Sequence, residues 1–477
     1  ELFDVASVSQ LNADYGQILQ QVISNPTRPL SQALSLSVDA YTRVATAAVS
    51  STARSSPPRR VTSRAVAQVA QIDFEHEFQL DPAITPSGPP PVRADGLSRL
   101  FLTGATGFIG AYLLGELLKR TDSEIVCLVR ARDEADGLRR IRENLANYEL
   151  SAPGVEDRVN VVVGDFAKPL FGLTQHAFDR LASEIDVIYH NGADVNLVLP
   201  YEALRPVNVF GTREVLRLAC HIHTKTTHVV STFTVQTTEK NRGQVVRETD
   251  ALPPCEELMH GYSQTKWVSE KMIGVARERG LPVTIFRPGH VTGDSRTGAA
   301  NTNDLLHTFV LVCMRLGLAP LRDVEIDVTP VDYVAQAIAH ISLRNESLGK
   351  TFHLTNPKPL QAPVLVKWME DFKMGIDRVP YDVWRDRVFE LADQLETPEL
   401  KLLGDILGPR VLSDDEAHAV HPRFDCAGTL KALANTNIQC APADRRLLTT
   451  YLAYLRQIGT VGEIETDEVG QLGSETP

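Results

Sequence analysis

At 477 residues, with 43% apolar and 23% charged side chains, the chain can bury a large core and build one or two smaller parts. Its net charge of −12 argues against broad binding to nucleic acid or to an anionic membrane, because both would repel it. The six cysteines show no CxxC pair and no zinc-ligand spacing, and no apolar run reaches the ~18 residues of a membrane helix. We therefore expect a reduced, cytoplasmic protein without a metal site.

The first 92 residues are not predicted to form a substantial hydrophobic core. Residues 1–48 show apolar side chains at helical spacing, which predicts one short helical element. Residues 49–92 are rich in Ser, Arg, Pro and Gly, which predicts a linker that ends near Arg93. The start is neither a signal peptide nor an initiating methionine, so we expect the chain to be cut from something longer.

Residues 93–358 alternate between short apolar runs and helical patterns. The runs are almost continuously apolar, which is typical of a parallel sheet that is covered on both faces. The fold class predicted is α/β, a doubly wound parallel (Rossmann) sheet with interleaved substrate elements. The predicted strands are Leu100–Thr103, Ile125–Val129, Val159–Val163, Val187–His190, His228–Thr232 and Val283–Phe286.

The last part of the chain predicts helices. Residues 359–460 carry apolar side chains at helical spacing, and we expect a smaller, mostly helical substrate region there. Residues 461–477 are acidic and predict a flexible tail. The helical pattern rests on Trp368, Met369 and Phe372, and on Leu447, Leu448, Tyr451, Leu452 and Leu455.

A glycine-rich turn follows the first predicted strand and opens a leucine-rich helix. Its spacing is GxxGxxG, in which glycines keep the turn tight and let backbone N–H groups reach a pyrophosphate. An ordinary turn would also use glycines, but the place between strand and helix favours dinucleotide binding. The predicted cofactor-binding residues of this turn are Thr103, Gly104, Thr106, Gly107, Phe108, Ile109 and Gly110.

Arginines follow the second predicted strand, where an NAD enzyme usually places an acid for the ribose hydroxyl. Arg130 can offer a charge-assisted fork to the 2′-phosphate of NADP, and Arg140 is a second candidate. The alternative is a solvated basic loop. We favour NADPH over NADH because the arginines carry positive charge where the 2′-phosphate would lie.

Three further segments are predicted to line the cofactor. Asp165 and Phe166 after the third strand could flank the adenine or form a plain turn. Small residues after the fourth strand leave room for the cofactor, and the turn after the sixth strand would pass under the nicotinamide. The residues of these two segments are Asn191, Gly192, Ala193, Arg287, Pro288 and Gly289.

Tyr262 and Lys266 begin a predicted helix and lie one turn apart on a single face. A lysine ammonium there would favour the phenolate and reach the nicotinamide ribose, which suits general acid catalysis. Thr232, at the end of the fifth predicted strand, could donate to the substrate oxygen beside Tyr262. By itself YxxxK is more often a surface pair, and Thr232 could be an ordinary strand residue.

With these residues placed, the chain from about residue 78 to 458 resembles the extended short-chain dehydrogenases. Within them it is similar to the thioester reductase domains that terminate nonribosomal peptide synthetases, carboxylic acid reductases and aminoadipate reductases. The resemblance implies that Thr232, Tyr262 and Lys266 are the catalytic residues. It is carried by Leu80–Ile84, Cys127–Ala131, His190–Asn196, Gly261–Trp267, Phe286–Gly289, Pro330–Val334 and Phe352–Pro357.

The resemblance implies NADPH-dependent release of an acyl or peptidyl thioester from the phosphopantetheine arm of a carrier protein, as an aldehyde or, after a second reduction, an alcohol. It also implies that residues 359–460 help to receive that arm. Residues 1–48 are similar to the end of a condensation domain or, alternatively, to a carrier-protein tail, and no carrier motif is present. We therefore expect the carrier elsewhere in a larger synthetase. A nucleotide-sugar epimerase or dehydratase, a fatty acyl-CoA reductase and a non-catalytic dinucleotide-binding protein remain alternatives.

Overall fold

A seven-stranded, all-parallel sheet lies at the centre of the computed structural model, which describes residues 72–88, 98–301, 304–372, 374–394 and 422–459. Its strand order places β1 next to β4, and the order in which successive strands are added reverses between these two. Ligands of such sheets bind at this point, beyond the carboxyl ends of the strands. In spatial order the strands are β12 (Thr351–Leu354), β7 (Val283–Pro288), β5 (Thr226–Val230), β4 (Val187–His190), β1 (Leu100–Thr103), β2 (Ile125–Val129) and β3 (Val159–Val163).

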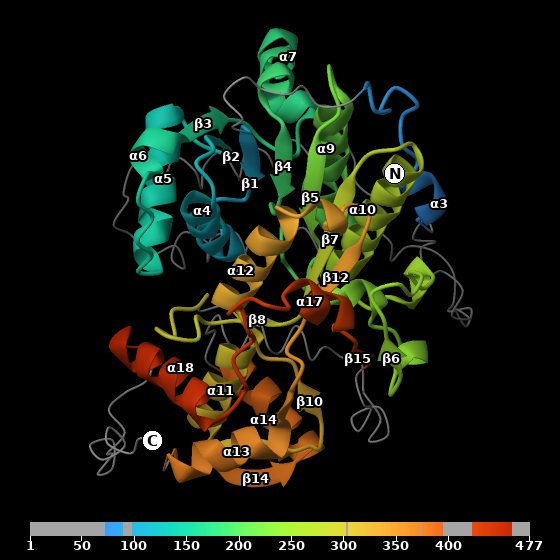
Figure 1. Cartoon of the computed structure of the whole chain (residues 1–477). Coiled ribbons are helices and arrows are strands. Elements are labelled where there is room, and N and C mark those ends of the chain that lie inside the picture. The colour runs from blue at the N-terminus through green and yellow to red at the C-terminus, as the bar shows by residue number, and fades with distance from the viewer. Residues whose placement is uncertain (1–71, 89–97, 302–303, 373, 395–421, 460–477) are drawn as a thin grey trace, which may run out of the picture. The chain divides into compact units, whose positions relative to one another are not determined.

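Helices cover both faces of this sheet (Figure 1). Three of them share one apolar core with the strands, which explains the continuously apolar strand sequences. These are α4 (Phe108–Arg120), α5 (Glu134–Asn147) and α12 (Val331–Ser342). The other face is covered by α7 (Gln175–Glu184), α9 (Gly211–Cys220) and α10 (Gly261–Glu278), and the short helices α6 (Val155–Arg158) and α8 (Tyr201–Arg205) lie in connections.

The predicted doubly wound α/β fold is confirmed, and the first four predicted strands match residue for residue. The fifth, β5, begins and ends two residues earlier than predicted. The N–H of Ser231 still bonds to the carbonyl of Phe286 at 2.7 Å, but Thr232 has already turned out of the sheet. The edge strand β12 was not among the predicted strands, because polar side chains interrupt its apolar run.

The linker predicted over residues 49–92 is wrong in its last part. Residues 73–88, here called the strap, are docked on the sheet domain and begin with α3 (Phe74–Glu77). The strap buries Phe74, Leu80 and Ile84, of which Ile84 is only 1% exposed. Composition alone predicted a linker because these three anchors are spaced among proline and polar residues. Predictions for residues 1–71, 89–92 and 461–477 lie outside the described residues.

Polar contacts reinforce the strap. Both carboxylate oxygens of Glu77 accept from the guanidinium of Arg205 at 2.6 Å, and the hydroxyl of Tyr201 donates to the same carboxylate at 2.6 Å. The guanidinium of Arg279 donates to the carbonyls of Leu80, Asp81 and Ile84 at 2.7–2.8 Å. The strap is therefore a structural part of the sheet domain.

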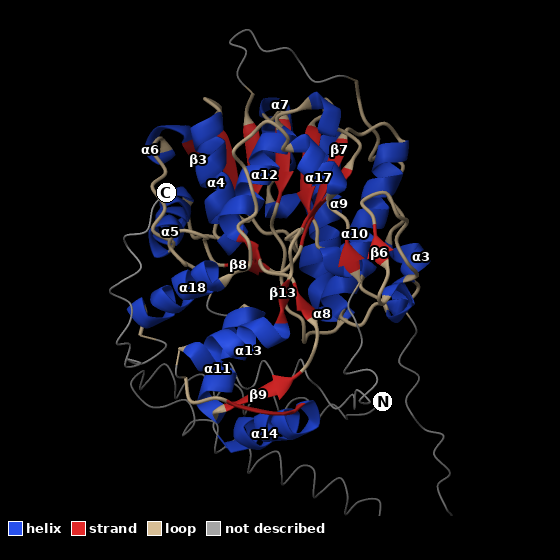
Figure 2. Cartoon of the chain, turned by 60° about the horizontal axis from the view of Figure 1, so that its bottom comes forward, coloured by secondary structure: helices blue, strands red, loops and turns tan. Residues whose placement is uncertain are grey.

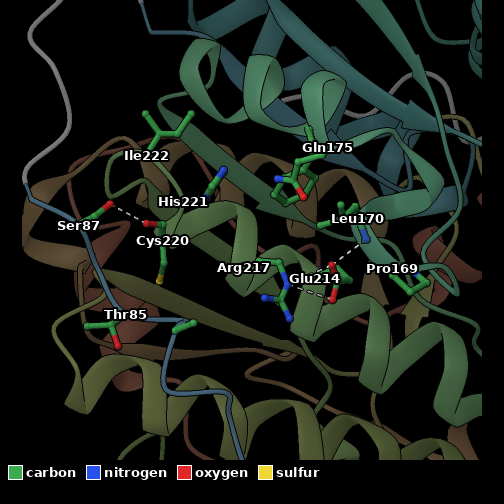
Figure 3. Close-up of a pocket in the computed structure, with 12 residues that line it drawn as sticks. Thr85, Ser87, Pro169, Leu170, Gln175, Glu214, Arg217, Cys220, His221 and Ile222 are labelled. Atoms are coloured by element: carbon green, nitrogen blue, oxygen red, sulfur yellow. Dashed lines mark hydrogen bonds and ion pairs between the residues drawn. The ribbon is translucent and has the colours of Figure 1, made fainter.

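A cavity of about 430 Å³ lies beside the strap, between it and α7 and α9 (Figure 3). Ser87 donates to the carbonyl of Cys220 across one side at 2.8 Å, and Glu214 accepts from the N–H of Leu170 on the other at 2.9 Å. None of its lining residues belongs to the glycine-rich turn or to the predicted catalytic trio. The cavity is therefore distinct from the carboxyl ends of the strands, where ligands of such sheets bind.

A second apolar core forms a smaller lobe, grouped apart from the sheet in Figure 2. The predicted helical spacing is confirmed, since Trp368, Met369, Leu447 and Leu448 are all buried there. The lobe differs from the expected 359–460 region because its core also includes a helix before residue 359. Its elements are α11 (Leu305–Leu316), β9 (Leu318–Leu321), α13 (Ala362–Asp371), β14 (Asp377–Pro380), α14 (Tyr381–Gln394) and α18 (Arg445–Gln457).

Between α14 and α18 the described chain returns to the sheet domain. There β15 (Arg423–Phe424) pairs with β6 (Val245–Val246), and α17 (Ala427–Ala432) packs beside β12. Glu248 fixes this return, because its carboxylate accepts from the N–H groups of Gly428 and Thr429 and from that of His353. Among the described residues no helix is both long and apolar enough to cross a membrane.

Candidate active site

The glycine-rich turn closes tightly against the loop after β4. Gly104 has a φ of 75°, and a Cβ atom on it would lie 2.7 Å from the Cα of Gly192. A Cβ on Gly110 would lie 1.9 Å from the carbonyl oxygen of Gly104. Gly107 is the N-cap of α4 and offers no side chain to its first N–H groups. Those N–H groups and the helix dipole suit a pyrophosphate, so the turn fits a dinucleotide.

Thr103 does not face this cradle. Its side chain is fully buried, and its hydroxyl accepts from the N–H groups of Asn191 and Gly192 at 3.1 and 2.9 Å. It lies 3.0 Å from Nδ1 of His190, whose Nε2 lies 3.1 Å from the hydroxyl of Thr212. Burial lowers the pKa of His190 to about 3, so its ring is neutral. Thr103 therefore shapes the site by joining β1 to the loop after β4.

The other residues predicted in the turn contribute through their backbone. The ring of Phe108 packs against Tyr112 and Tyr148, and Ile109 packs against the sheet core. The side chain of Thr106 is half-buried. The packing of Phe108 and Ile109 holds the start of α4, whose N–H groups are the donors suited to a pyrophosphate.

The structure brings the two predicted phosphate-binding arginines together. Arg130 directly follows β2 and is exposed, and its carbonyl accepts from the guanidinium of Arg140 on α5. The neighbouring Arg132 is instead paired with Asp136 at 3.2 Å. Arg130 and Arg140 thus lie together at the carboxyl end of β2.

The predicted adenine-side residues lie beside the glycine-rich turn. The ring of Phe166 lies so close that a Cβ on Gly192 would be 2.5 Å from its Cζ. The carboxylate of Asp165 accepts from the N–H of Ala167 at 3.0 Å and so caps its own turn. The amide of Asn191 lies 3.4 Å from the carbonyl of Gly104, and Ala193 is half-buried behind it.

The predicted catalytic residues lie on two elements that hydrogen bonds join. Tyr262 and Lys266 lie on the first turns of α10, 7% and 3% exposed, and the ammonium of Lys266 donates to the carbonyl of Val230 at 2.9 Å. Thr232 is the N-cap of the 3₁₀ turn η3 (Phe233–Gln236) and lies 3.1 Å from the hydroxyl of Thr234. Ser263, next to Tyr262, donates to that same hydroxyl at 3.0 Å, so the two elements are joined at the site.

Burial sets the protonation of this pair. It raises the pKa of the Tyr262 phenol above its ordinary value, and it lowers the pKa of Lys266 to about 8. The sequence predicted that Lys266 would acidify Tyr262, but the pKa of Tyr262 is raised, because burial disfavours the phenolate. Tyr262 is therefore a protonated donor at neutral pH.

Arg287 was predicted to contact the cofactor, and in the structure its guanidinium is otherwise occupied. It is 4% exposed and pairs with the buried carboxylate of Glu270 at 2.6 Å. Pro288 ends β7 and is buried. A Cβ atom on Gly289 would lie 1.9 Å from the carboxylate of Asp327, so only glycine leaves space for that carboxylate.

Sequence reasoning missed three residues that order the site. Asn208 lies in a π-helical turn, η2 (Pro206–Phe210), and bridges the backbone of Asp194 to the hydroxyl of Thr265 on α10. Glu270 and Gln236 hold Arg287. A signal existed for Glu270 alone, since it follows Lys266 by four residues. Among the described residues no group of His, Cys, Asp and Glu has the arrangement of a metal site.

Relatives are found by sequence. The family model described as "Male sterility protein" matches residues 102–338. A linear gramicidin synthase of Brevibacillus parabrevis is 38% identical over 81% of this chain, and a nonribosomal peptide synthetase of Aspergillus flavus is 34% identical over 72%. The matches span only 8% and 35% of those proteins.

Solved structures are similar over their full length. The terminal R domain from the myxalamid PKS-NRPS pathway is 44% identical, with a TM-score of 0.78, and the match covers 82% of this chain and 99% of that one. A reductase domain of a Mycobacterium tuberculosis nonribosomal peptide synthetase is 27% identical, with a TM-score of 0.62 and 82% and 97% covered. The glycine-rich turn has the geometry that a nicotinamide dinucleotide needs. The chain therefore belongs to the terminal reductase domains of nonribosomal peptide synthetases, a family of nicotinamide-dependent oxidoreductases.

Proposed function

We propose that the chain uses NADPH to release an acyl or peptidyl group from the phosphopantetheine thioester of a carrier protein, as an aldehyde or, after a second reduction, as an alcohol. The observation that carries this proposal is the hydrogen-bonded link from Thr232 through Thr234 to Ser263, next to Tyr262 on α10, together with a glycine-rich turn that suits a dinucleotide. The matched relatives are much longer synthetases, which favours a carrier supplied by the same assembly.

The proposed chemistry asks the chain for hydrogen-bond donors. When bound, the reduced nicotinamide supplies a hydride to the thioester carbonyl carbon. Tyr262 and Thr232 would donate hydrogen bonds to the oxygen as it gains negative charge, and Tyr262 would then protonate it. Lys266, held by the carbonyl of Val230, would supply positive charge nearby. The resulting hemithioacetal then loses its hydroxyl proton as its carbon–sulfur bond breaks, the leaving thiolate takes up a proton, and the products are a free thiol and an aldehyde.

The test supplies NADPH or NADH with a panel of carrier-bound acyl thioesters and identifies the products by mass. Consumption of NADPH with formation of aldehyde or alcohol supports the proposal. A fatty acyl-CoA reductase would accept free acyl-CoA as well as the carrier-bound thioester. Tightly copurifying NAD without net consumption would favour an epimerase, and no turnover with any thioester would contradict the proposal.

The cofactor phosphate gives a first prediction. Replacing Arg130 and Arg140 by Ala should weaken NADPH binding about 10- to 100-fold, because charge-assisted hydrogen bonds to the 2′-phosphate are lost. NADH binding should stay unchanged. The Kd of each cofactor by fluorescence titration checks this, with Arg132→Ala as the matched control since Arg132 is paired with Asp136. An equal loss with both cofactors would rule the assignment out.

The proton of Lys266 gives a second prediction. Burial lowers its pKa to about 8, so the cationic form is present below that pH and is lost above it. Since the ammonium is the active form, kcat should be level near pH 7 and fall about tenfold per pH unit above pH 8. A kcat profile from pH 6 to 10 measures this.

Another buried lysine supplies the control. Burial also lowers the pKa of Lys225 to about 8, and its ammonium donates to the carbonyls of His221 and His223. A Lys225→Met variant should keep the alkaline fall in kcat. Loss of the fall in that variant would assign it to Lys225 instead of Lys266.

A further inference from the structure

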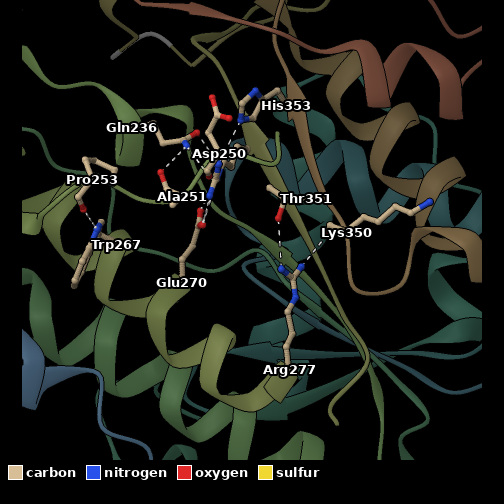
Figure 4. A network of polar contacts seen from close by, with 11 residues as sticks. Gln236, Asp250, Ala251, Pro253, Trp267, Glu270, Arg277, Lys350, Thr351 and His353 are labelled. Carbon is tan, nitrogen blue, oxygen red and sulfur yellow. Dashed lines mark hydrogen bonds and ion pairs between the residues drawn. The ribbon is translucent and has the colours of Figure 1, made fainter. Parts of the chain in front are cut away.

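A buried arginine joins the two elements that carry the proposed catalytic residues. Arg287 lies on β7, and its Nε and Nη2 atoms donate to the carboxylate oxygens of Glu270 at 2.6–3.2 Å. Glu270 lies one turn after Lys266 on α10 and is 5% exposed. The Nη1 atom of Arg287 donates to Oε1 of Gln236 at 2.6 Å. Figure 4 shows Gln236 and Glu270 converging on this point from two different elements.

The Gln236 end of this connection is also fixed. Gln236 is the last residue of η3, the turn that Thr232 caps, and it is fully buried. Its Nε2 donates to the carbonyls of Asp250 and Ala251 at 3.1 and 3.5 Å. Because every hydrogen-bonding atom of its side chain is used, a shift of η3 relative to α10 would break at least one of these bonds.

His353 on β12 makes the third contact. Its Nε2 lies 3.4 Å from Nη1 of Arg287, and its Nδ1 lies 2.9 Å from the carbonyl of Asp425, just after β15. A guanidinium only donates, so Nε2 accepts and Nδ1 carries the proton. Burial and Arg287 lower the pKa of His353 to about 4, which keeps this ring neutral. The connection therefore continues into the returning C-terminal segment.

The alternative interpretation is that the ion pair of Arg287 and Glu270 only stabilises the core. Buried ion pairs seldom add much stability, because desolvation offsets their attraction. The Arg287 guanidinium is buried. Its hydrogen bonds to Glu270 and Gln236 connect α10, which carries Tyr262 and Lys266, to the turn that Thr232 caps. That arrangement is suited to holding two elements at a set spacing.

We propose that Glu270, Arg287 and Gln236 form a clamp that fixes the Thr232 hydroxyl relative to the Tyr262 and Lys266 face of α10. The clamp acts as a positioning device and touches no substrate. This inference rests on the proposed roles of Thr232, Tyr262 and Lys266 in the reductase reaction.

The clamp also controls the charge beside Lys266. Lys266 faces Tyr262 and Glu270 on its own helix, Val230 on β5 and the neutral His190 on β4. Arg287 from β7 faces Glu270 from the other side. Removing the carboxylate should therefore move the alkaline fall in kcat to lower pH, and removing the guanidinium should move it to higher pH.

The experiment compares Glu270→Gln, Arg287→Met and Gln236→Met for kcat, KM, NADPH affinity and the pH profile. We expect Arg287→Met to lose about 100-fold in kcat, as is typical when catalytic groups are misplaced by about 1 Å, with the Kd for NADPH unchanged. The two charge variants should shift the pH profile in opposite directions. Gln236→Met should lower kcat without shifting the profile, and it keeps the ion pair, so it tests the clamp even if Arg287→Met does not fold.

Arg277 supplies the matched control. It is another arginine that ties strand ends, donating to the carbonyls of Val283 and Lys350 at 3.0 and 2.8 Å, and it lies on the far part of α10 in Figure 4. An Arg277→Met variant should lose stability but keep kcat and the pH profile. Equal kcat losses in Arg277→Met and Gln236→Met, or unmoved profiles in both charge variants, would overturn the clamp.

The pKa of Lys266 can also be followed without turnover, by titrating ¹³C-labelled lysine in NMR spectra with Lys266→Arg for assignment. Opposite shifts in Glu270→Gln and Arg287→Met would support the clamp even if no thioester were reduced. In that case the proposed function would fail while the clamp stood. Unchanged titration in both variants would refute the clamp alone.

Discussion

A Tyr262→Phe variant should lose about 10²- to 10³-fold in kcat for thioester reduction, the loss seen when one preorganised oxyanion donor is removed. The phenol is the donor proposed for this role, and its side chain is only 7% exposed, with burial raising its pKa. Phenylalanine keeps the ring and its packing, so the fold and the cofactor affinity should stay unchanged. NADPH oxidation at saturating thioester, with Kd for NADPH by fluorescence, measures both.

Tyr189 on β4 gives the control for this substitution. It is also buried, and its hydroxyl lies 2.8 Å from that of Ser342 on α12, in the core of the opposite face. Tyr189→Phe should cost about 1 kcal/mol of stability and leave kcat unchanged. A Tyr262→Phe variant that consumed NADPH at the normal rate would contradict the role of Tyr262.

The sheet and the helix that carries Tyr262 and Lys266 were predictable because their signals are local. Ile125–Val129 is continuously apolar, and all of its residues are in fact buried. The spacing of Tyr262 and Lys266 needs only the 3.6-residue helical period to bring them to one face. Thr232 was found in the correct region but assigned to a strand, because its role as an N-cap depends on where β5 leaves the sheet.

The partners of Arg287 could not be predicted, because they are long-range. Glu270 and Gln236 lie 17 and 51 residues away from it along the chain. The position of Arg287 after the sixth predicted strand placed it under the nicotinamide, but in the fold its guanidinium pairs with the carboxylate of Glu270. The direction of the Tyr262 pKa could not be predicted for a similar reason. Helical spacing predicts that Tyr262 and Lys266 share one face, but it does not predict the burial that raises the pKa of the phenol.

The strap shows that composition alone does not locate a domain boundary. It also predicts a large loss of stability when the strap is removed. A chain that starts at Arg93, the boundary predicted from composition, should lose about 5–9 kcal/mol of stability relative to one that starts at Ile72. That figure follows from the three buried anchors Phe74, Leu80 and Ile84, at about 1.5–3 kcal/mol each. Domains are stable by only about 5–15 kcal/mol in total, so the shorter chain should be largely unfolded at 37 °C.

Thermal unfolding of the two chains checks this, and a point variant separates packing from chain length. Ile84→Ala in the longer chain should cost about 2–5 kcal/mol, because it leaves a cavity at a side chain that is 1% exposed. Leu343→Ala, at a leucine that is 51% exposed, should cost little and serves as its control. If the chain from Arg93 unfolded at the same temperature as the chain from Ile72, the strap would be an attachment and the boundary predicted from composition would stand.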